Sequence, residues 1–304
     1  MNAIDFNNYL FRCSSLGKLM VGANKGLTDN QNTTLIGLIE KRNNAKLTDK
    51  QTITLGKLLE QRDAPKELSS TTKSYLKTLH REEMMKRSKK VQSKYLDKGV
   101  IVEEKSISLY SSVFGKLLLK NKQRFHNKFI TGEPDNIQGI VRDFKSSFDF
   151  STFPLYETDI TNEDYKAQLH GYMNLTGITE SELIYCLIDT PNKIIEDELR
   201  RLDWRYSIFN IEGEIREECI EIVVEKVQEM IFTEKGLEEF CNYNPNIKKE
   251  WFTDFFELPE EMRIKVFPLV YDKEFIEIMQ EQISKSREYL NELTLTIAKD
   301  LIYA

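Results

Sequence analysis

Residues 132–145, GEPDNIQGIVRDFK, limit the fold of this chain more than any other stretch of the sequence. Asp135 lies at a turn signal, Gly-Glu-Pro-Asp, between two predicted strands. On the second strand Asp143 and Lys145 share one face, while Phe144 points the other way into a core. The pattern therefore predicts that two carboxylates and an ammonium group converge on rigid strands.

Hydrophobic periodicity places these strands in a mixed α/β pattern. Helices are predicted at about 101–120 and 162–176, and strands at 125–131, 137–145 and 182–189. The order helix, strand, strand, helix, strand predicts a central mixed sheet flanked by helices. The C-terminal part is predicted to be mostly amphipathic helix, with an extra strand at 263–272 and a long closing helix at 274–302.

A repeat with an offset of 20 residues precedes this core. The segment LTDNQNTTLIGLIEKRN is echoed by LTDKQTITLGKLLEQRD, and a weaker third copy begins at LSSTTKSYL. Their predicted helix N-caps are Thr28, Thr48 and Ser69. Residues 24–98 are therefore predicted to form a small helical module.

Positive charge is concentrated in the N-terminal part of the chain. Residues 1–130 hold 25 Lys and Arg against 12 Asp and Glu, or +13, and the remainder holds 18 against 37, or −19. Lys and Arg bind DNA phosphates, so this part suits a polyanion, although any single charge run could be a solvated helix face. A basic helix at 73–98, ended by Gly99 in the left-handed conformation, is expected to contact the DNA backbone. Its charged face comprises Arg81, Lys86, Lys89 and Lys90.

Two aspartates held by strands form part of a site for a hard divalent cation such as Mg²⁺, which prefers carboxylate oxygens and water. A third carboxylate is expected from the preceding helix, where Glu103 and Glu104 are both available. Glu103 lies on the apolar face of that helix and Glu104 on a polar face, so Glu103 is the predicted ligand. The apolar face is made by Ile107, Tyr110 and Phe114.

Lys145 and Gln168 are expected to be the remaining residues of the catalytic site. Lys145 can touch an attacking water or a scissile phosphate, where bound metal would neutralise the phosphate and lower the pKa of a water. Gln168 lies at the edge of the buried stripe of its helix, and its amide can bond the lysine, the phosphate or a metal-bound water. Thr161 and Asp164 form the predicted capping box of that helix.

These residues form four motifs in a fixed order. They are Gly-x-x-x-Glu at 99–103, Pro-Asp at 134–135, Asp-x-Lys at 143–145 and Tyr-x-x-Gln at 165–168. The set resembles that of the YqaJ-type viral recombinases, which include lambda exonuclease. The resemblance implies a PD-(D/E)xK, restriction-endonuclease-like α/β core. Its implied metal ligands are Glu103, Asp135, Asp143 and the backbone carbonyl of Phe144, and its implied catalytic set adds Lys145 and Gln168.

The opening FRCSSLGKLM is similar to the N-terminal segment of the same family, which implies a site for a terminal DNA phosphate at Arg12 with Ser14 or Ser15. The resemblance covers about 9–22 and 99–190. It implies one nuclease domain, 1–304. The parts of that domain are a core at 1–23 and 99–195, a helical insertion at 24–98 and a mostly helical extension at 196–304.

The resemblance also implies an activity. YqaJ-type enzymes are processive 5′ to 3′ exonucleases of duplex DNA in phage recombination. They use Mg²⁺, often as ring-shaped trimers paired with a single-strand annealing protein. We therefore expect ends of double-stranded DNA as substrate and one or two Mg²⁺ ions per site, which Mn²⁺ could replace. An endonuclease on the same core and a non-catalytic DNA-binding or assembly module are the alternatives.

Other classes of protein find no support in the sequence. Each Gly-Lys pair is followed by Leu, where an ATP-binding phosphate loop needs Ser or Thr. The cysteines are scattered singly, which predicts buried thiols and no iron–sulfur cluster, and the histidines lack metal-binding spacing. The sequence holds no run of about 18 apolar residues and no signal peptide, so we expect a cytoplasmic protein without membrane contact.

Overall fold

The computed structural model describes residues 4–23, 27, 29–63, 67–89 and 93–302. Contacts divide the chain into two compact units. The first comprises Met1–Ser88, Asn127–Ile130 and Asp272–Ala304, and the second comprises Lys89–His126 and Thr131–Tyr271. Within the described residues, no helix is both long and apolar enough to cross a membrane.

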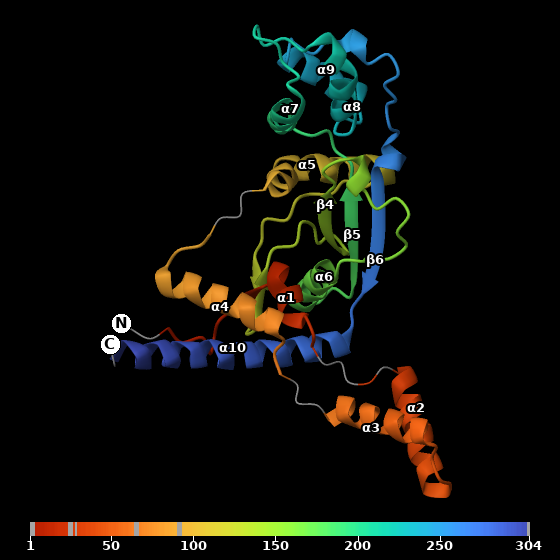
Figure 1. Ribbon diagram of the computed structural model, residues 1–304, viewed down its shortest axis with the longest axis vertical. Helices are drawn as coiled ribbons and strands as arrows, with labels where there is room; N and C mark the ends of the chain where they lie inside the picture. Colours follow the sequence, from red (N-terminus) through yellow and green to blue (C-terminus); the bar gives the residue numbers. More distant parts are fainter. Residues whose placement is uncertain (1–3, 24–26, 28, 64–66, 90–92, 303–304) are drawn as a thin grey trace. The chain divides into compact units, whose positions relative to one another are not determined.

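The first unit is mostly helical (Figure 1). Its elements are β1 (Phe11–Arg12), the 3-10 turn η1 (Cys13–Ser15), α1 (Leu16–Met20), α2 (Asp29–Asn44), α3 (Asp49–Asp63), α4 (Ser70–Met85) and α10 (Lys273–Ile302). Helices α1, α4 and α10 pack against one another, while α2 and α3 pack as a pair. The N-terminal segment is tied to the closing helix because the amide of Phe6 donates to the side chain of Asn291 at 3.0 Å.

The sequence repeat is the α2–α3 hairpin. Its two copies supply equivalent leucines, Leu35 and Leu38 from α2 and Leu55 and Leu58 from α3, which pack together in a small core of their own. The amide of Gln51 donates to the hydroxyl of Thr48 at 3.3 Å, which confirms the predicted cap of α3. Thr28, the predicted cap of α2, lies outside the described residues.

The third copy of the repeat, α4, begins as predicted but packs elsewhere. The hydroxyl of Ser69 accepts the amide of Thr72 at 3.1 Å, which confirms the cap. The Thr72 side chain is fully buried and donates to the backbone oxygen of Lys18 in α1 at 3.0 Å. At the other end of the helix, buried His80 bonds the Thr294 hydroxyl of α10 at 2.9 Å. Helix α4 therefore belongs to the packed α1–α10 assembly.

The prediction of one basic helix ended by Gly99 is wrong. Helix α4 ends at Lys86, which adopts the left-handed conformation with φ 51°, and a new helix, α5 (Lys94–Phe114), runs through Gly99. It ends at Gly115, where φ is 61°. Burial explains the difference, because Lys98, Val102, Ser106, Leu109 and Tyr110 form a continuous buried stripe across the glycine. Packing of that stripe outweighs the cost of about 1 kcal/mol for one glycine inside a helix.

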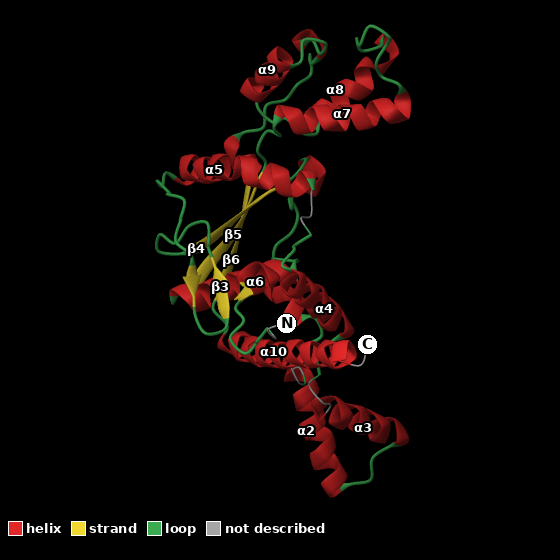
Figure 2. Ribbon diagram, turned by 90° about the vertical axis from the view of Figure 1, so that its left-hand side faces the viewer, coloured by secondary structure: helices red, strands yellow, loops and turns green. Residues whose placement is uncertain are grey.

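The second unit contains the mixed sheet and the remaining helices (Figure 2). After α5 come β2 (Phe125–His126), β3 (Ile130–Gly132), β4 (Val141–Ser146), η2 (Phe150–Thr152), α6 (Glu163–Thr176) and β5 (Glu180–Cys186). They are followed by α7 (Asn192–Tyr206), η3 (Glu217–Cys219), α8 (Ile220–Gln228), α9 (Glu234–Tyr243), η4 (Lys249–Trp251), η5 (Glu260–Arg263) and β6 (Ile264–Val270). The strand predicted at 125–131 is instead two short strands, β2 and β3, which pair antiparallel.

The sheet order is β4–β5–β6, with β4 parallel and β6 antiparallel to β5. Phe144 of β4 is buried with Val102 and Ile107 of α5 on one face. On the other face, Asp143 bonds Gln168 of α6. The predicted central mixed sheet flanked by helices is confirmed, and β4 is its edge strand.

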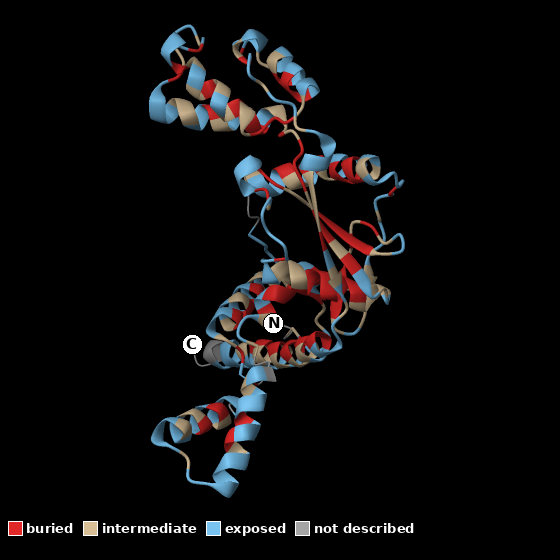
Figure 3. Ribbon diagram, turned by 90° about the vertical axis from the view of Figure 1, so that its right-hand side faces the viewer, coloured by how far each residue is buried: buried red, intermediate tan, exposed pale blue. Residues whose placement is uncertain are grey.

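Helices α7, α8 and α9 enclose a second core of this unit, and Figure 3 shows their buried positions in red. Beside this core, the carboxylate of Asp189 accepts hydrogen bonds from the amides of Phe232 and Thr233 at 2.6 and 3.2 Å. The carboxylate lies so close to Gly236 that a Cβ there would come within 2.3 Å of Asp189 Oδ2. Any larger residue there would force the Asp189 carboxylate out of this position.

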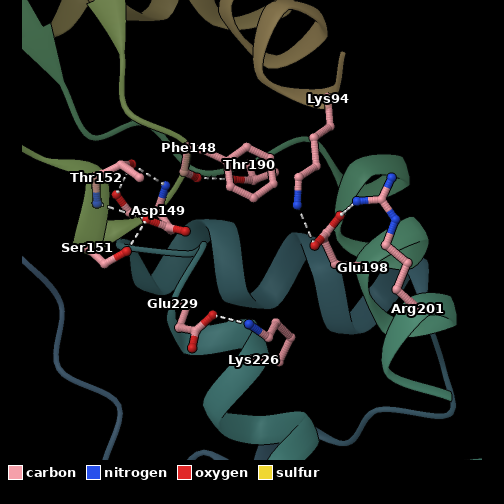
Figure 4. Close-up of polar contacts among 10 residues, drawn as sticks. All are labelled: Lys94, Phe148, Asp149, Ser151, Thr152, Thr190, Glu198, Arg201, Lys226 and Glu229. Carbon is pink, nitrogen blue, oxygen red and sulfur yellow. Dashed lines mark hydrogen bonds and ion pairs between the residues drawn. The ribbon is translucent and has the colours of Figure 1, made fainter. Parts of the chain in front are cut away.

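Helix α5 is joined to this helical part by polar contacts (Figure 4). Lys94 Nζ lies 2.7 Å from Glu198 of α7, which also pairs with Arg201 at 2.8 Å. The carbonyl of Phe148 accepts the Thr190 hydroxyl at 3.3 Å and the Nζ of fully buried Lys98 at 2.9 Å. A lysine buried so completely is costly in its charged form.

We expect Lys98→Met to raise the free energy of unfolding at pH 7 by about 1–3 kcal/mol. Burial lowers the pKa of Lys98 to about 7, against the opposing charges of Asp189 and Asp149. Between pH 7 and about 10.5 the unfolded chain binds the proton and the folded chain does not, so wild-type stability rises with pH across that window. Urea unfolding at pH 7 and pH 10 should therefore show a gain for Lys98→Met that shrinks at the higher pH.

The matched control for this prediction is Lys105→Met, since Lys105 is exposed on the same helix. Its substitution should leave the pH dependence of unfolding as in the wild type. After the change at Lys98, the Phe148 carbonyl still accepts a hydrogen bond from the Thr190 hydroxyl. A lower stability of Lys98→Met at pH 7 would contradict the explanation.

Candidate functional site

The site is built on the open edge of β4. The loop before β4 folds back on the strand, so Asn136 and Arg142 exchange backbone hydrogen bonds of 3.2 and 2.8 Å. This places the Oδ2 of Asp135 2.6 Å from the amide nitrogen of Phe144, from which it accepts a hydrogen bond. The N–H and C=O of one strand residue point to the same side, so the carbonyl of Phe144 faces this edge as well.

A buried arginine holds the loop in that position. Arg142 is 2% exposed, and its Nε donates to Glu182 of β5 at 2.8 Å while its Nη1 donates to the side-chain oxygen of Asn136 at 3.0 Å. The hydroxyl of Tyr110 donates to the same Glu182 oxygen at 3.0 Å. The position of Asp135 therefore depends on a network on the opposite face of β4.

Asp143 and Lys145 lie on the face of β4 that α6 covers. Asp143 is 2% exposed, and its Oδ2 is 2.5 Å from Lys145 Nζ. Its Oδ1 accepts from Gln168 Nε2 at 3.2 Å, and the same amide nitrogen donates to the hydroxyl of Tyr172 at 2.8 Å. The Lys145 ammonium also lies 4.8 Å from the ring centre of Tyr165. The structure thus brings together the predicted Asp-x-Lys and Gln168.

The carboxylates of Asp135 and Asp143 repel each other. Burial first, and then the charge of Asp143, raise the pKa of Asp135 well above its usual range. Asp135 keeps some accessible area, but protein atoms surround its carboxylate densely. Burial alone would lower the pKa of Lys145, but its ion pair with Asp143 outweighs burial and the pKa is raised. Lys145 is therefore an ammonium ion at neutral pH.

Glu103 of α5 lies near enough to Asp135 for their charges to interact. Its charge contributes to the raised pKa of Asp135, and its carboxylate lies 2.9 Å from Lys120 Nζ. Glu103 is half-buried, whereas Glu104, one residue on, is exposed. Phe114 is 43% exposed, so the predicted apolar face of α5 ends at Tyr110.

Sequence reasoning missed Lys120, whose pKa is raised by its hydrogen bond to Glu103 despite partial burial. Lys120 lies in a segment without regular structure, and no spacing rule pointed to it. It also missed Asn136, Arg142 and Glu182, which look like ordinary surface residues in the sequence. The predicted Thr161 cap is wrong, because Asn162 caps α6 by accepting the amide of Asp164 at 2.9 Å.

The donor set suits a hard divalent cation. Among the described residues, no three Asp, Glu, His or Cys side chains already stand in a metal-holding arrangement. However, Asp143 Oδ2 is buried with no hydrogen bond of good geometry, and its close neighbour is the Lys145 ammonium. Two carboxylates that repel each other, beside a carbonyl on the same edge, are oxygen ligands of the kind Mg²⁺ takes. In this structure the Lys145 ammonium pairs with Asp143, and the Lys120 ammonium pairs with Glu103.

The residues predicted to bind DNA phosphates belong mainly to the first unit. Arg12 and Ser14 are exposed, and Ser15 is half-buried, where β1 passes into η1. Arg81 is exposed on α4 and Lys86 just beyond it, where Lys86 pairs with Glu83 at 3.7 Å. Lys89 belongs to the second unit, and Lys90 lies outside the described residues.

Comparison with known proteins identifies the fold of this chain. No family model and no curated protein matches the sequence. A phage-related exonuclease from Haemophilus somnus 129PT superposes with a TM-score of 0.58 at 19% identity, over 95% of this chain and 97% of that chain. An alkaline exonuclease from Laribacter hongkongensis gives 0.47 at 9% identity over 77% of this chain and 87% of that one, and its complex with dAMP gives 0.46. The chain shares the fold of the Haemophilus somnus protein.

We expect Arg142→Met to lower the free energy of unfolding by about 3 kcal/mol, because it leaves the partly buried carboxylate of Glu182 and the buried side chain of Asn136 without the guanidinium. Urea unfolding at pH 7 measures the change. The control is Arg124→Met, which removes an exposed ion pair to Glu133 and should cost no more than about 0.5 kcal/mol. Equal effects of the two substitutions would show that the Arg142 network does not hold the loop.

We expect Asp135→Asn to stabilise the protein at pH 8 in EDTA by on the order of 1 kcal/mol. A raised pKa means that the wild type loses stability as pH rises from about 4, where the unfolded carboxyl ionises, towards the higher folded pKa. The asparagine keeps an oxygen for the Phe144 amide and has no charge to bury. Thermal unfolding of both proteins at pH 5 and pH 8 tests this. The stability gain of Asp135→Asn over the wild type should be larger at pH 8 than at pH 5, and a smaller gain at pH 8 would contradict the prediction.

Proposed function

We propose that this protein is a divalent-metal-dependent exonuclease of the YqaJ type that hydrolyses phosphodiester bonds at the ends of duplex DNA. The observation that carries the proposal is the convergence of Asp135, Asp143, Lys145 and Gln168 at the open edge of β4. The shared fold with a phage-related exonuclease supports it. The four motifs stand in the order typical of that family.

Four groups of this chain would hold the metal: the carboxylates of Glu103, Asp135 and Asp143 and the carbonyl of Phe144. When bound, Mg²⁺ or Mn²⁺ supplies neutralisation of the phosphate and a lowered pKa for a bound water. One or two ions are compatible with this number of ligands. The raised pKa of Asp135 fits the role, because a cation favours the ionised carboxylate that burial disfavours.

Lys145 and Gln168 would act around that centre. The Lys145 ammonium would donate hydrogen bonds to the scissile phosphate or to the attacking water. Gln168 is bonded to both Asp143 and Tyr172, so it keeps the Asp143 carboxylate oriented. Orientation of a ligand by such a partner is worth about 10–100-fold in metal affinity or activity in other metal sites.

The remainder of the proposal follows the family. The terminal 5′ phosphate would bind at Arg12 with Ser14 or Ser15, digestion would proceed 5′ to 3′, and the single strand produced would be passed to an annealing protein in phage-type recombination. A trimer would suit processive digestion. Arg81 and Lys86 are exposed cations that can contact the backbone without reading sequence.

Two DNA substrates test the activity. With Mg²⁺, a linear duplex bearing 5′ phosphates should be degraded and the same DNA as a closed circle should survive, and EDTA should abolish the loss. Asp143→Ala should lower the rate more than about 100-fold, since it removes a metal ligand and not merely a partner of one. Gel electrophoresis and release of acid-soluble nucleotides measure the result.

Adjacent residues of α5 provide the matched pair. Glu103→Ala should lose most activity, while Glu104→Ala, which changes an exposed carboxylate one residue away, should keep it. Cutting of the closed circle would replace the proposal with an endonuclease on the same core. No cleavage of either DNA with Mg²⁺ or Mn²⁺ would leave a non-catalytic DNA-binding module.

A further inference from the structure

The first unit contains an open cleft along α1 and α4 that the proposed chemistry does not use. It has a volume of about 600 Å³. Its lining consists of one lysine, four hydroxyl residues and one tyrosine: Lys18, Ser70, Thr71, Ser74, Tyr75 and Thr78. The lining contains no carboxylate and no aliphatic side chain. Such a surface suits an anion with many oxygen acceptors.

The two helices are held rigidly together beneath the cleft. The buried Thr72 hydroxyl donates to the carbonyl of Lys18 at 3.0 Å, and the carbonyl of Val21 lies 3.4 Å from the same oxygen. Just beyond α1, Gly22 has a φ of +67°, and a Cβ there would meet the Cβ of Ser69 at 3.1 Å. The spacing between α1 and the start of α4 is therefore set by packing and needs no ligand.

The hydroxyl groups of α4 form one exposed row. Thr71, Ser74 and Thr78 are exposed and follow the spacing of one helix face. The next turn of that face carries Arg81, which is also exposed. Polar side chains thus recur about once per turn, roughly every 5.4 Å along the helix. The Thr78 hydroxyl already donates to the carbonyl of Ser74 at 3.3 Å, so the donors open to a ligand in this row are Thr71, Ser74 and Arg81. An extended polyanion lying along α4 would meet these donors in succession, whereas a small anion would use one.

Lys18 is the cation of the cleft, and it has no ion-pair partner within the described part of the chain. Arg12, outside the lining, likewise forms no ion pair among the described residues, and both side chains are exposed. Lys18 Nζ lies 5.2 Å from the ring centre of Tyr75. Burial and the charge of Glu82 raise the pKa of Tyr75, while Ser15 and the charge of Arg12 lower it. Tyr75 thus lies close to the Arg12 and Ser15 segment as well as lining the cleft.

We propose that the α1–α4 cleft binds the sugar–phosphate backbone of the DNA strand that continues from the terminal phosphate. This rests on the proposed function, which assigns the terminal phosphate to Arg12 with Ser14 or Ser15. Lys18 neutralises one phosphate, and the hydroxyls of Ser74 and its neighbours donate hydrogen bonds to phosphate oxygens. Tyr75, which lines the cleft beside Lys18, is the positioning residue that this proposal assigns to the Ser15 segment. The contacts read no base, so binding does not depend on sequence.

Equilibrium binding in EDTA, where no cleavage occurs, tests the cleft. Fluorescence anisotropy with a 5′-phosphorylated duplex is measured across a range of salt concentrations. Lys18→Gln should reduce the slope of log affinity against log salt by about 0.9, the value for one duplex phosphate. Lys57→Gln, which makes the same charge change at an exposed position of α3, should leave the slope unchanged. An unchanged slope for Lys18→Gln would overturn the proposal.

Tyr75→Phe tests the link to the terminal phosphate, because it removes the hydroxyl and keeps the ring. It should reduce the preference for a 5′-phosphorylated end over a 5′-hydroxyl end several-fold, with the salt slope unchanged. A merely structural role would not alter that preference. Ser74→Ala should weaken binding to both ends equally. Equal preference in Tyr75→Phe and wild type would refute the positioning role.

The design separates this inference from the nuclease proposal. A wild type that binds the duplex, shows the slope change with Lys18→Gln and cleaves nothing would keep the cleft and refute the nuclease. If the wild type digests linear DNA and Lys18→Gln leaves the salt slope unchanged, the nuclease proposal stands and the cleft proposal is refuted. Urea unfolding of each variant verifies that the fold is intact.

Discussion

The buried guanidinium of Arg142 is the interaction on which the candidate site depends. It lies on the α5 face of β4, yet it sets the position of Asp135 at the strand edge by bonding Asn136 and by its own backbone exchange with that residue. A buried charge of this kind needs every partner in place, because an unpaired one costs several kcal/mol. Glu182 from β5 supplies the compensating charge. One strand therefore carries structural polar groups on one face and the candidate site residues on the other.

The chemical face is held in an electrostatically unfavourable state. Asp135 and Asp143 are close enough for the charge of one to raise the pKa of the other, and burial adds to the effect. The ammonium groups of Lys145 and Lys120 relieve part of the repulsion by pairing with Asp143 and Glu103. A divalent cation would relieve more of it, and would free Lys145 to face a phosphate. Stability given up at such a site is a common cost of function.

Prediction from the sequence succeeded where local pattern and tertiary packing agree. The alternation of Asp143, Phe144 and Lys145 predicted which side chains share a face, and the structure confirms it because β4 is covered on both faces. Prediction failed where packing overrode a local signal. Gly99 has the residue type of a helix end, but the buried stripe that includes Lys98 carries α5 through it. The repeat predicted the helical pair α2–α3, yet its third copy packs on α1 and α10 through Thr72 and His80.

The sequence by itself determined the residue types of the site and the strand and helices that carry them, because side-chain alternation and helical periodicity are local properties of the chain. Only the tertiary structure decided which distant groups meet there. The Lys120 pair with Glu103, the Arg142 network and the proximity of Tyr75 to Ser15 each involve residues distant in sequence. Such contacts are selected by burial and by the need to satisfy every buried polar group, and neither requirement can be evaluated before the chain is folded.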